Sequence, residues 1–258
     1  MKNIEKTLLY YELLMIYNDT SNYLQYELPN GYHYEFYKNG DEDAWVKIHI
    51  SSMEFGSYKK GLEYFHDFYD DFINELPKRC IFIVDDNTGE KIGTATISPL
   101  KNKEYGYDAA VDWVAIKKEH QRFGLSKPLI SRFIKLANEL GHEKLILHTQ
   151  THTWLAAKIY LDVGFIPFKV EDSLLGWQIL KTITNSKILN NIDKIPYNSM
   201  FSDTAIKIYN KLEKSFNDDF SYEIWYKNGR NDVYVYHDGV EYSYKYYEKE
   251  NEIILLEV

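Results

Sequence analysis

The fold is decided by the stretch Gln121-Arg122-Phe123-Gly124-Leu125-Ser126 and by the segments that flank it. Before it, residues 111–116 are mostly apolar and β-branched, a composition typical of a buried strand. After it, apolar residues recur at helical spacing as far as Leu140, and Gly141 follows as a stop signal. The pattern therefore predicts a strand, a loop and a helix in that order.

A loop at the start of a helix is suited to bind an anion. The first backbone N–H groups of a helix have no partner within it, and the aligned peptide dipoles place partial positive charge there. Gly124 and Ser126 leave space for a ligand, while Arg122 and Lys127 add cations for phosphate oxygens. On these residues alone, a plain structural turn is an equally good interpretation.

A second segment favours the binding interpretation. Residues 153–165 read Thr-Trp-Leu-Ala-Ala-Lys-Ile-Tyr-Leu-Asp-Val-Gly-Phe, which predicts a short helix with Gly164 at its C-terminal cap and Tyr160 one turn earlier. In this order and separation, the two segments together resemble the signature motifs of the GNAT superfamily of acyl-CoA-dependent N-acetyltransferases. The resemblance covers roughly residues 31–182.

The first family motif, Arg/Gln-x-x-Gly-x-Gly/Ala, matches Gln121, Gly124 and Ser126, with Ser where Gly or Ala is usual. The second, Asn-x-x-Ala-x-x-x-Tyr-x-x-x-Gly-Phe, starts at Thr153, with Thr in place of Asn, and includes Ala156. The resemblance implies that acetyl-CoA is the cosubstrate. It also implies which residues contact acetyl-CoA: the backbone N–H groups of Val114 and Ile116 at the thioester oxygen and pantetheine arm, and Gln121, Arg122, Phe123, Gly124, Leu125, Ser126, Lys127, Thr153 and Ala156 elsewhere.

The order of predicted elements is that of a mixed α+β domain. We expect a strand at 32–37, helices at 41–53 and 58–76, a strand pair at 80–84 and 92–97 joined by a turn, and a strand at 144–149. The resemblance implies the GNAT acyl-CoA N-acyltransferase fold, a mixed and mostly antiparallel sheet. Its fourth and fifth strands splay apart, and the thioester enters the gap. Residues 165–170 and 175–180 are expected to close the sheet as a hairpin.

Four parts are predicted along the chain. Residues 1–27 are expected to form a helix that packs on the core, residues 28–182 the GNAT domain, residues 183–200 a linker, and residues 201–258 a small unit. That unit is predicted as a helix capped by Ser202 and an antiparallel meander with turns at Asn228-Gly229 and Asp238-Gly239. Three roles remain open for it: a module that makes a homodimer, a lid or shelf for the acceptor, and a decoration.

Two side chains are candidates for the chemistry. The resemblance assigns Tyr160 the role of acid toward the departing thiolate, and the alternative is a Tyr buried as core. Asp112 is the first choice for the base, because a carboxylate in an otherwise apolar strand should face the cleft or be paired. A solvent-facing Asp112 is an equally weighted alternative, and Asp108 and Glu104 are weaker candidates.

No metal is expected. His148 and His152 span a strand end and a loop, without Cys or carboxylate in a zinc pattern, and the nearby His120 and His142 add no such pattern. Cys80 has no positioned base in its sequence context, so a small buried strand residue is the better interpretation.

Composition limits the function further. The net charge of the 258-residue chain is −9 and its Lys and Arg are dispersed, which argues against nucleic acid and suits a cationic substrate. A single cysteine, no apolar run of membrane-spanning length and no secretory signal favour the cytoplasm, with no membrane partner.

The leading hypothesis is an N-acetyltransferase that forms a ternary complex, in which a primary amine attacks acetyl-CoA directly. Its acceptor is a small amine or a peptide amine. The alternative is a GNAT-fold module that binds acyl-CoA without catalysis and acts through its C-terminal unit. Nucleic-acid binding by that unit is weaker, since nine Lys and Arg face thirteen acidic residues from position 186 onward.

Overall fold

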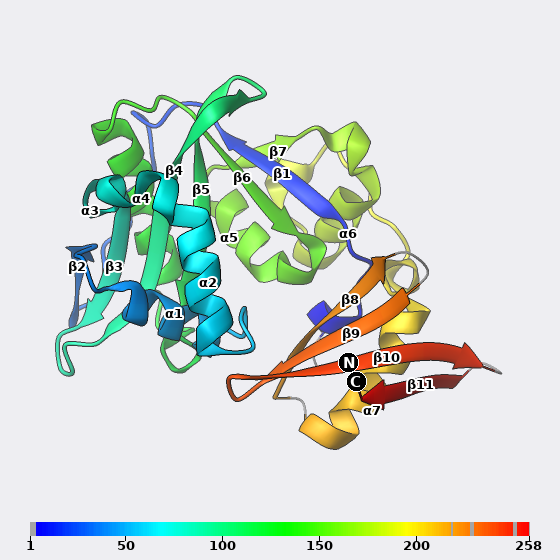
Figure 1. The fold of residues 1–258 in the computed structure, drawn as a ribbon. Helices are drawn as coiled ribbons and strands as arrows, with labels where there is room; N and C mark the ends of the chain where they lie inside the picture. The colour runs from blue at the N-terminus through cyan, green and yellow to red at the C-terminus, as the bar shows by residue number, and fades with distance from the viewer. Residues whose placement is uncertain (1–3, 218, 228–229, 250–251, 258) are drawn as a thin grey trace.

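The computed structural model describes residues 4–217, 219–227, 230–249 and 252–257. They form a seven-stranded sheet of order β2-β3-β4-β5-β6-β1-β7 and a four-stranded sheet of order β11-β10-β9-β8 (Figure 1). None of the helices in these ranges is long and apolar enough to cross a membrane. The strands of the large sheet are β1 (Glu12–Tyr17), β2 (Tyr32–Phe36), β3 (Cys80–Asp85), β4 (Lys91–Glu104), β5 (Tyr107–Ile116), β6 (Leu145–Gln150) and β7 (Ile166–Phe168).

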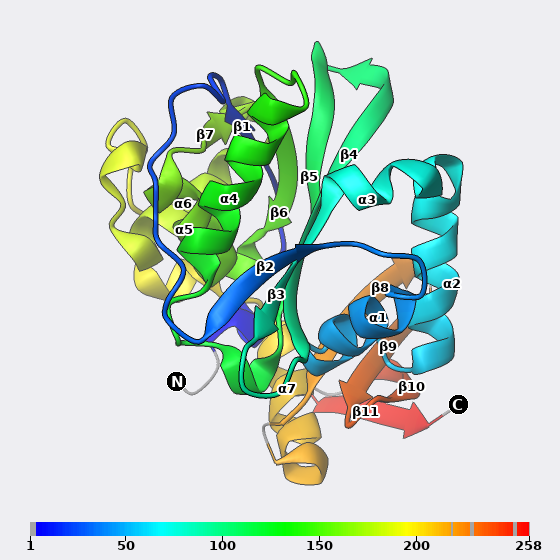
Figure 2. The ribbon, with the colours of Figure 1, turned by 90° about the vertical axis from the view of Figure 1, so that its left-hand side faces the viewer.

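Helices cover both faces of this sheet (Figure 2). Strand β3 is buried along its whole length, and its residues alternate between the two faces: Ile81 packs in the cluster with α4 and α5, and Phe82 in the cluster with α1 and α2. The helices on the two faces are α1 (Glu42–Ser51), α2 (Tyr58–Tyr69) and α3 (Leu76–Arg79) on one side, and α4 (Ser126–Glu139) and α5 (Trp154–Val163) on the other.

Most of the expected elements are confirmed. Strand β5, the loop after it and helix α4 follow one another as predicted, and β3 and β4 form the expected antiparallel pair. Helix α5 ends at Gly164, whose φ of +110° is the left-handed cap that the glycine allows. The helix expected at 58–76 is divided, because Phe72 leaves helical geometry and a short 3-10 segment, Asp70–Glu75, separates α2 from α3.

The prediction of a helix over residues 1–27 is wrong. Residues 12–17 form β1, which pairs antiparallel with β6 on one side and β7 on the other. Four of its six residues are buried, because a strand in the middle of a sheet is covered on both faces.

The predicted closing hairpin is also wrong. Residues 174–184 form helix α6 (Leu174–Thr184), and the strand beside β7 is β1. The later segment does not pair with the outer edge of β7, which ends the sheet, and packs over β1 as a helix. Gly176 permits this approach, because a Cβ there would lie 2.7 Å from Tyr11 Cβ and 2.9 Å from Leu13 Cδ2.

The C-terminal unit has the predicted arrangement. Helix α7 (Asp203–Phe216) begins after Ser202, whose hydroxyl accepts a hydrogen bond from the N–H of Ala205. The turn at Asp238 and Gly239 has positive φ at both residues, whereas Asn228-Gly229 lies outside the described residues. The strands are β8 (Ser221–Lys227), β9 (Arg230–His237), β10 (Val240–Lys249) and β11 (Glu252–Glu257).

The position of β1 can be tested by Met15→Ala. Met15 is fully buried in the middle of β1, so the change should lower the free energy of unfolding by about 2–5 kcal/mol in urea titration. Glu12→Ala, at the exposed start of the same strand, is the control and should change it by no more than about 0.5 kcal/mol. Equal small effects of both changes would contradict a central strand here.

Candidate functional site

The candidate site lies where β5 and β6 separate. These two strands are parallel, and they pair only at Ala110 and Ile146. Beyond this point each continues without the other, so the fourth and fifth strands counted from Tyr32 splay as expected. Backbone groups on the facing edges therefore have no ladder partner across the gap.

Strand β5 also carries a β-bulge at the gap. Thr96 pairs with Asp112 and Thr94 with Ala115, so Trp113 and Val114 together lie opposite the single residue Ala95. Trp113 has a φ of +53°, a left-handed conformation that is uncommon for a bulky residue. Backbone strain of this kind is often found at functional sites.

The bulge leaves backbone groups directed into the gap. The N–H of Lys117 donates to the carbonyl of Ile92 at 2.8 Å, and neighbouring residues of a strand direct their backbone groups to opposite sides. The N–H and C=O of Ile116 therefore point away from β4, and Gln121 Nε2 donates to the Ile116 carbonyl at 3.1 Å. The bulge interrupts this alternation at Trp113 and Val114, so the expected contact of the Val114 N–H with the thioester stays a prediction.

The loop before α4 has the geometry of an anion cradle. Arg122 and Gly124 both have positive φ, +68° and +79°. Leu125 gives α4 no side-chain cap, and none of the N–H groups of residues 122–127 has an acceptor within the described part of the chain. The loop thus offers a row of unused donors at the positive end of a 14-residue helix.

The cations of this loop differ in availability. Lys127 forms an ion pair with Asp162 at 3.1 Å, but Lys158 shares the same carboxylate at 2.8 Å, so the charge of Lys127 is balanced only in part. Arg122 is exposed and has no ion pair among the described residues, and Phe123 beside it is 58% exposed. Gln121 holds the loop to the end of β5 through its side chain.

Thr153 is used locally. Its hydroxyl lies 3.0 Å from the hydroxyl of Thr149 and donates to the carbonyl of Gln150 at 3.1 Å. These bonds stabilise the turn that leads into α5. Ala156 is partly exposed on the first turn of α5. A cofactor contact at either residue stays a prediction.

Tyr160 is buried on α5, and the charges of two carboxylates affect its pKa. Burial, followed by the negative charges of Glu54 and Asp112, raises the pKa of Tyr160. The phenol therefore stays neutral and keeps its proton to donate. The ring of Tyr160 also packs against Phe165 in the core. Its position is therefore consistent both with a core residue and with a catalytic acid.

Asp112 lies beside Thr96 on the face of the sheet that α1 and α2 cover. Burial raises the pKa of the Asp112 carboxyl, and the Ser98 hydroxyl and His148 oppose that shift in part. Asp112 is half-buried, and its role as the base stays a prediction. The weaker candidates are engaged elsewhere, Glu104 with His148 at 3.0 Å and Asp108 with His142 at 3.1 Å.

The sequence analysis did not identify the pair formed by His49 and Glu54. The Nδ1 of His49 lies 2.5 Å from Glu54 Oε2, and His49 is completely buried whereas the side chain of Glu54 is 38% exposed. His49 Nε2 has no hydrogen-bond partner within the described residues. No motif marks this pair, because it joins the end of α1 to a loop whose shape depends on distant contacts.

His49 is held among aromatic rings. Its ring centroid lies 4.1 Å from that of Trp45, 5.9 Å from Phe55 and 5.4 Å from Trp113. Trp113 belongs to the bulge of β5. The ring of His49 therefore contacts Glu54 through its Nδ1 and packs against the splayed strand through Trp113.

The other histidines and the cysteine do not form a centre. His148 and His142 contact different carboxylates, and His152 Nε2 lies 2.8 Å from the carbonyl of Leu8. Cys80 is buried as expected, and burial raises the pKa of its thiol to about 11. Asp219, His237 and Asp238 form the only group of described residues with metal-ligand spacing, and Asp219 there is already paired with Lys118.

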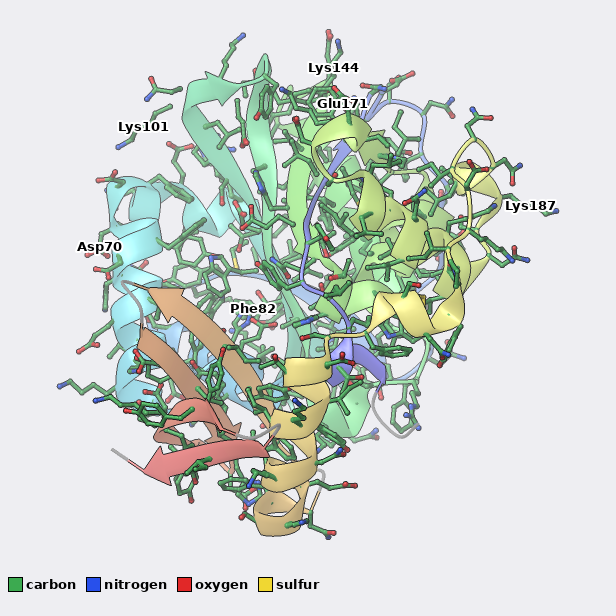
Figure 3. All side chains as sticks on the ribbon, turned by 90° about the vertical axis from the view of Figure 1, so that its right-hand side faces the viewer. Asp70, Phe82, Lys101, Lys144, Glu171 and Lys187 are labelled. Atoms are coloured by element: carbon green, nitrogen blue, oxygen red, sulfur yellow. The ribbon has the colours of Figure 1, made fainter. Side chains whose placement is uncertain are left out.

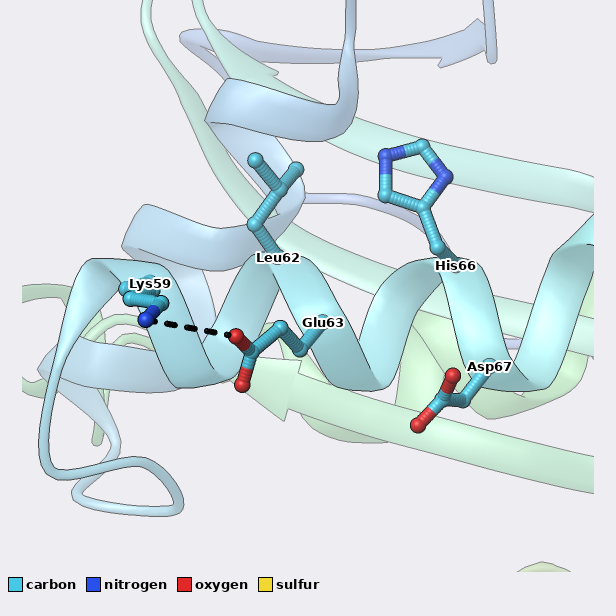
Figure 4. Close-up of a pocket in the computed structure, with 5 residues that line it drawn as sticks. All are labelled: Lys59, Leu62, Glu63, His66 and Asp67. Carbon is cyan, nitrogen blue, oxygen red and sulfur yellow. Dashed lines mark ion pairs between the residues drawn. The ribbon is translucent and has the colours of Figure 1, made fainter.

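A depression along α2 is a separate feature (Figure 4). Its residues come from one helix, and Lys59 and Glu63 in it form an i,i+4 ion pair at 3.8 Å. No second element contributes to it, so it represents the solvent face of the helix. The residues are Lys59, Leu62, Glu63, His66 and Asp67.

Comparisons with known proteins agree with this geometry. Residues 42–165 match the family model described as "Acetyltransferase (GNAT) family". The chain is similar to a GCN5-related N-acetyltransferase from Sphaerobacter thermophilus, with a TM-score of 0.50 and 15% identity over 63% of this chain and 49% of that one. The family resemblance and the fold are thereby confirmed.

Two further solved structures are more distant. A GNAT-family acetyltransferase from Colwellia psychrerythraea has a TM-score of 0.48 and 12% identity over 62% of this chain and 55% of that one. A GCN5-related N-acetyltransferase from Kribbella flavida has a TM-score of 0.41 and 18% identity over 64% and 58%. The matched part spans about half the length of the first solved structures. No curated protein matches the chain.

The half-buried Asp112 should cost stability when it ionises. Its pKa is raised in the folded state, so the folded protein binds more protons than the unfolded chain above the ordinary aspartate pKa of 3.8, and stability falls as pH rises through the raised pKa. Asp112→Asn should therefore raise Tm at pH 7, with a gain that shrinks toward pH 4, in calorimetry at both pH values. A gain that does not depend on pH would contradict this account.

Proposed function

Because residues 42–165 form a GNAT acetyltransferase domain, we propose that the protein transfers an acetyl group from acetyl-CoA to a primary amine in a ternary complex. One observation carries the proposal: unused backbone donors lie both along the loop at residues 122–127 and on the edge of β5 beside the gap. The first set suits a diphosphate and the second suits a thioester and its amide-containing arm.

On the donor side, the loop binds the diphosphate through its N–H groups, with Arg122 as the available cation and Phe123 exposed beside it. Gln121 holds the loop against β5. The N–H of Val114 stabilises the thioester oxygen as it becomes an oxyanion, and the N–H of Ile116 binds the pantetheine arm.

On the acceptor side, the amine arrives as an ammonium ion and must lose a proton before it can attack. Asp112 takes that proton, directly or through a water molecule, and its raised pKa makes it a better base than an ordinary carboxylate. The nitrogen lone pair then forms the new N–C bond at the thioester carbon, and the C–S bond breaks as the oxyanion collapses. The extra proton on the nitrogen leaves to give the neutral amide and replaces the proton that Tyr160 gives to the sulfur.

Tyr160 acts on the leaving group. Its phenol hydroxyl donates to the departing sulfur, and the thiolate leaves as CoA thiol once it is protonated. Since burial raises the pKa of Tyr160, a strong hydrogen bond to the sulfur is its main contribution before the proton moves.

The cofactor assignment is tested by Gly124→Glu. A Cβ at Gly124 meets nothing within 4 Å, so the variant should fold, but a carboxylate in the cradle should abolish the Tm increase that acetyl-CoA gives. Gly106→Glu is the matched control, because Gly106 also has positive φ and open space around it but lies in the β4–β5 turn. It should keep the full Tm increase. Absence of any increase in the unaltered protein would disprove the cofactor assignment.

The role of Tyr160 is tested by Tyr160→Phe. Loss of the hydroxyl should lower kcat about 10²–10⁴-fold and leave the Kd of acetyl-CoA unchanged, measured by thiol release across an amine panel and by calorimetry. Unchanged turnover would assign Tyr160 to the core alone. If the unaltered protein binds acetyl-CoA but releases no thiol with any amine, the non-catalytic binding module becomes the better explanation.

A further inference from the structure

The four-stranded sheet of the C-terminal unit packs against α7 with one face. Its other face is directed toward α1 and α2 of the large sheet. Val233 and Val235 pack in the cluster formed with α7. Residues directly opposite in an antiparallel pair share a face, so Ser221, Tyr236 and Glu241 lie together on the other face. Figure 3 shows β8 and β9 crossing in front of α2 from this side.

That second face is seated on the loop between α1 and α2, residues 52–57. The Ser221 hydroxyl donates to the carbonyl of Met53 at 2.8 Å. Glu241 forms an ion pair at 2.5 Å with Lys60 in the first turn of α2. The loop is therefore bonded to the C-terminal unit at its start and just beyond its end.

The two surfaces also touch without intervening space at Gly56. A Cβ on Gly56 would overlap the side chain of Glu241, and would lie 3.0 Å from Glu241 Cα and 2.6 Å from a ring carbon of Tyr236. Any side chain at this position would push the sheet away. Glycine is thus required here by close packing of the two parts.

Glu54 lies within this clamped loop. The residue before it, Met53, has a φ of +63°, and the Ser221 hydroxyl bonds that same residue. His49 fixes the carboxylate from the buried side, while part of the Glu54 side chain stays exposed. The next residue, Phe55, packs on Trp113 of the β5 bulge with 5.5 Å between ring centroids, so the loop that carries Glu54 lies beside the splayed strand.

We propose that the C-terminal unit forms the acceptor-side wall of the active site, and that the loop it clamps presents Glu54 to bind the ammonium group of the acceptor. This rests on the proposed acetyl transfer. Glu54 binds the charged amine, Asp112 receives its proton, and His49, Ser221 and Gly56 are positioning residues. Of the three roles considered for the C-terminal unit, this selects the shelf for the acceptor.

The clamp is tested without any acceptor. Ser221→Ala and Gly56→Val should each increase amide hydrogen exchange of residues 52–57 several-fold, and acetyl-CoA should still raise Tm by the full amount. Tyr247→Ser, at an exposed position of β10, is the control and should leave that exchange unchanged. Unchanged exchange in both loop-facing variants would overturn the clamp, whether or not the protein is an enzyme.

The role of Glu54 is tested kinetically with a panel of spermidine, tyramine, glucosamine and a peptide with a free N-terminus. For each amine that is acetylated, Glu54→Gln should raise KM about 10–100-fold, the loss of one charge-assisted bond, with a smaller change in kcat. Glu63→Gln, on the exposed side of α2, should match the unaltered protein. Asp112→Asn should instead lower kcat.

His49→Asn and Ser221→Ala should raise KM in the same direction as Glu54→Gln, by a smaller factor. A KM that Glu54→Gln leaves unchanged, with acetyl-CoA binding intact, would overturn the role of Glu54. If no amine in the panel is acetylated, the proposed function fails for these acceptors, and hydrogen exchange still decides the clamp.

Discussion

The structure depends on the loss of pairing between β5 and β6 after Ala110. Backbone groups that a continuous sheet would consume are left over, and an unpaired buried backbone group is costly unless it finds a partner. The bulge at Trp113 and Val114 increases this effect by turning the edge of β5 out of register. Helix α4 then starts beside the same edge with further unused donors. The gap, the bulge and the uncapped helix together make one surface. It has backbone N–H donors on the edge of β5 and at the start of α4, and an extended ligand could contact both sets.

Local chemistry accounts for the part of the fold that the sequence predicts. Gly124 and Gly164 mark positions of positive φ, and Ser202 caps α7, so these signals act within a few residues. The secondary structure predicted for residues 12–17 and for residues 174–184 was wrong for the same physical reason. A short apolar run suits a central strand as well as a helix, and only partners far along the chain decide between them. Helix α6 packs over β1, and Gly176 allows the close approach.

The site was predictable to a similar degree. Tyr160 and the loop at residues 121–126 follow from spacing, and Asp112 stands out as a charge within an apolar strand. Glu54 and His49 carry no such signal, because no motif marks the loop that joins them and part of its support comes from Ser221 and Glu241, far along the chain. A loop residue clamped by a segment about 170 residues later cannot be distinguished from any other surface glutamate in the sequence.

The central place of β1 has a consequence for how the molecule is made. Ile16 pairs with Ile146, 130 residues later, so the N-terminal strand has no partner while most of the domain is being synthesised. At roughly 5–20 residues per second, translation of that interval takes about 7–26 s. During this time the apolar strand β1 is exposed, because the strands that pair with it have not yet been synthesised. Completion of the large sheet must therefore be a late event in the synthesis of the domain.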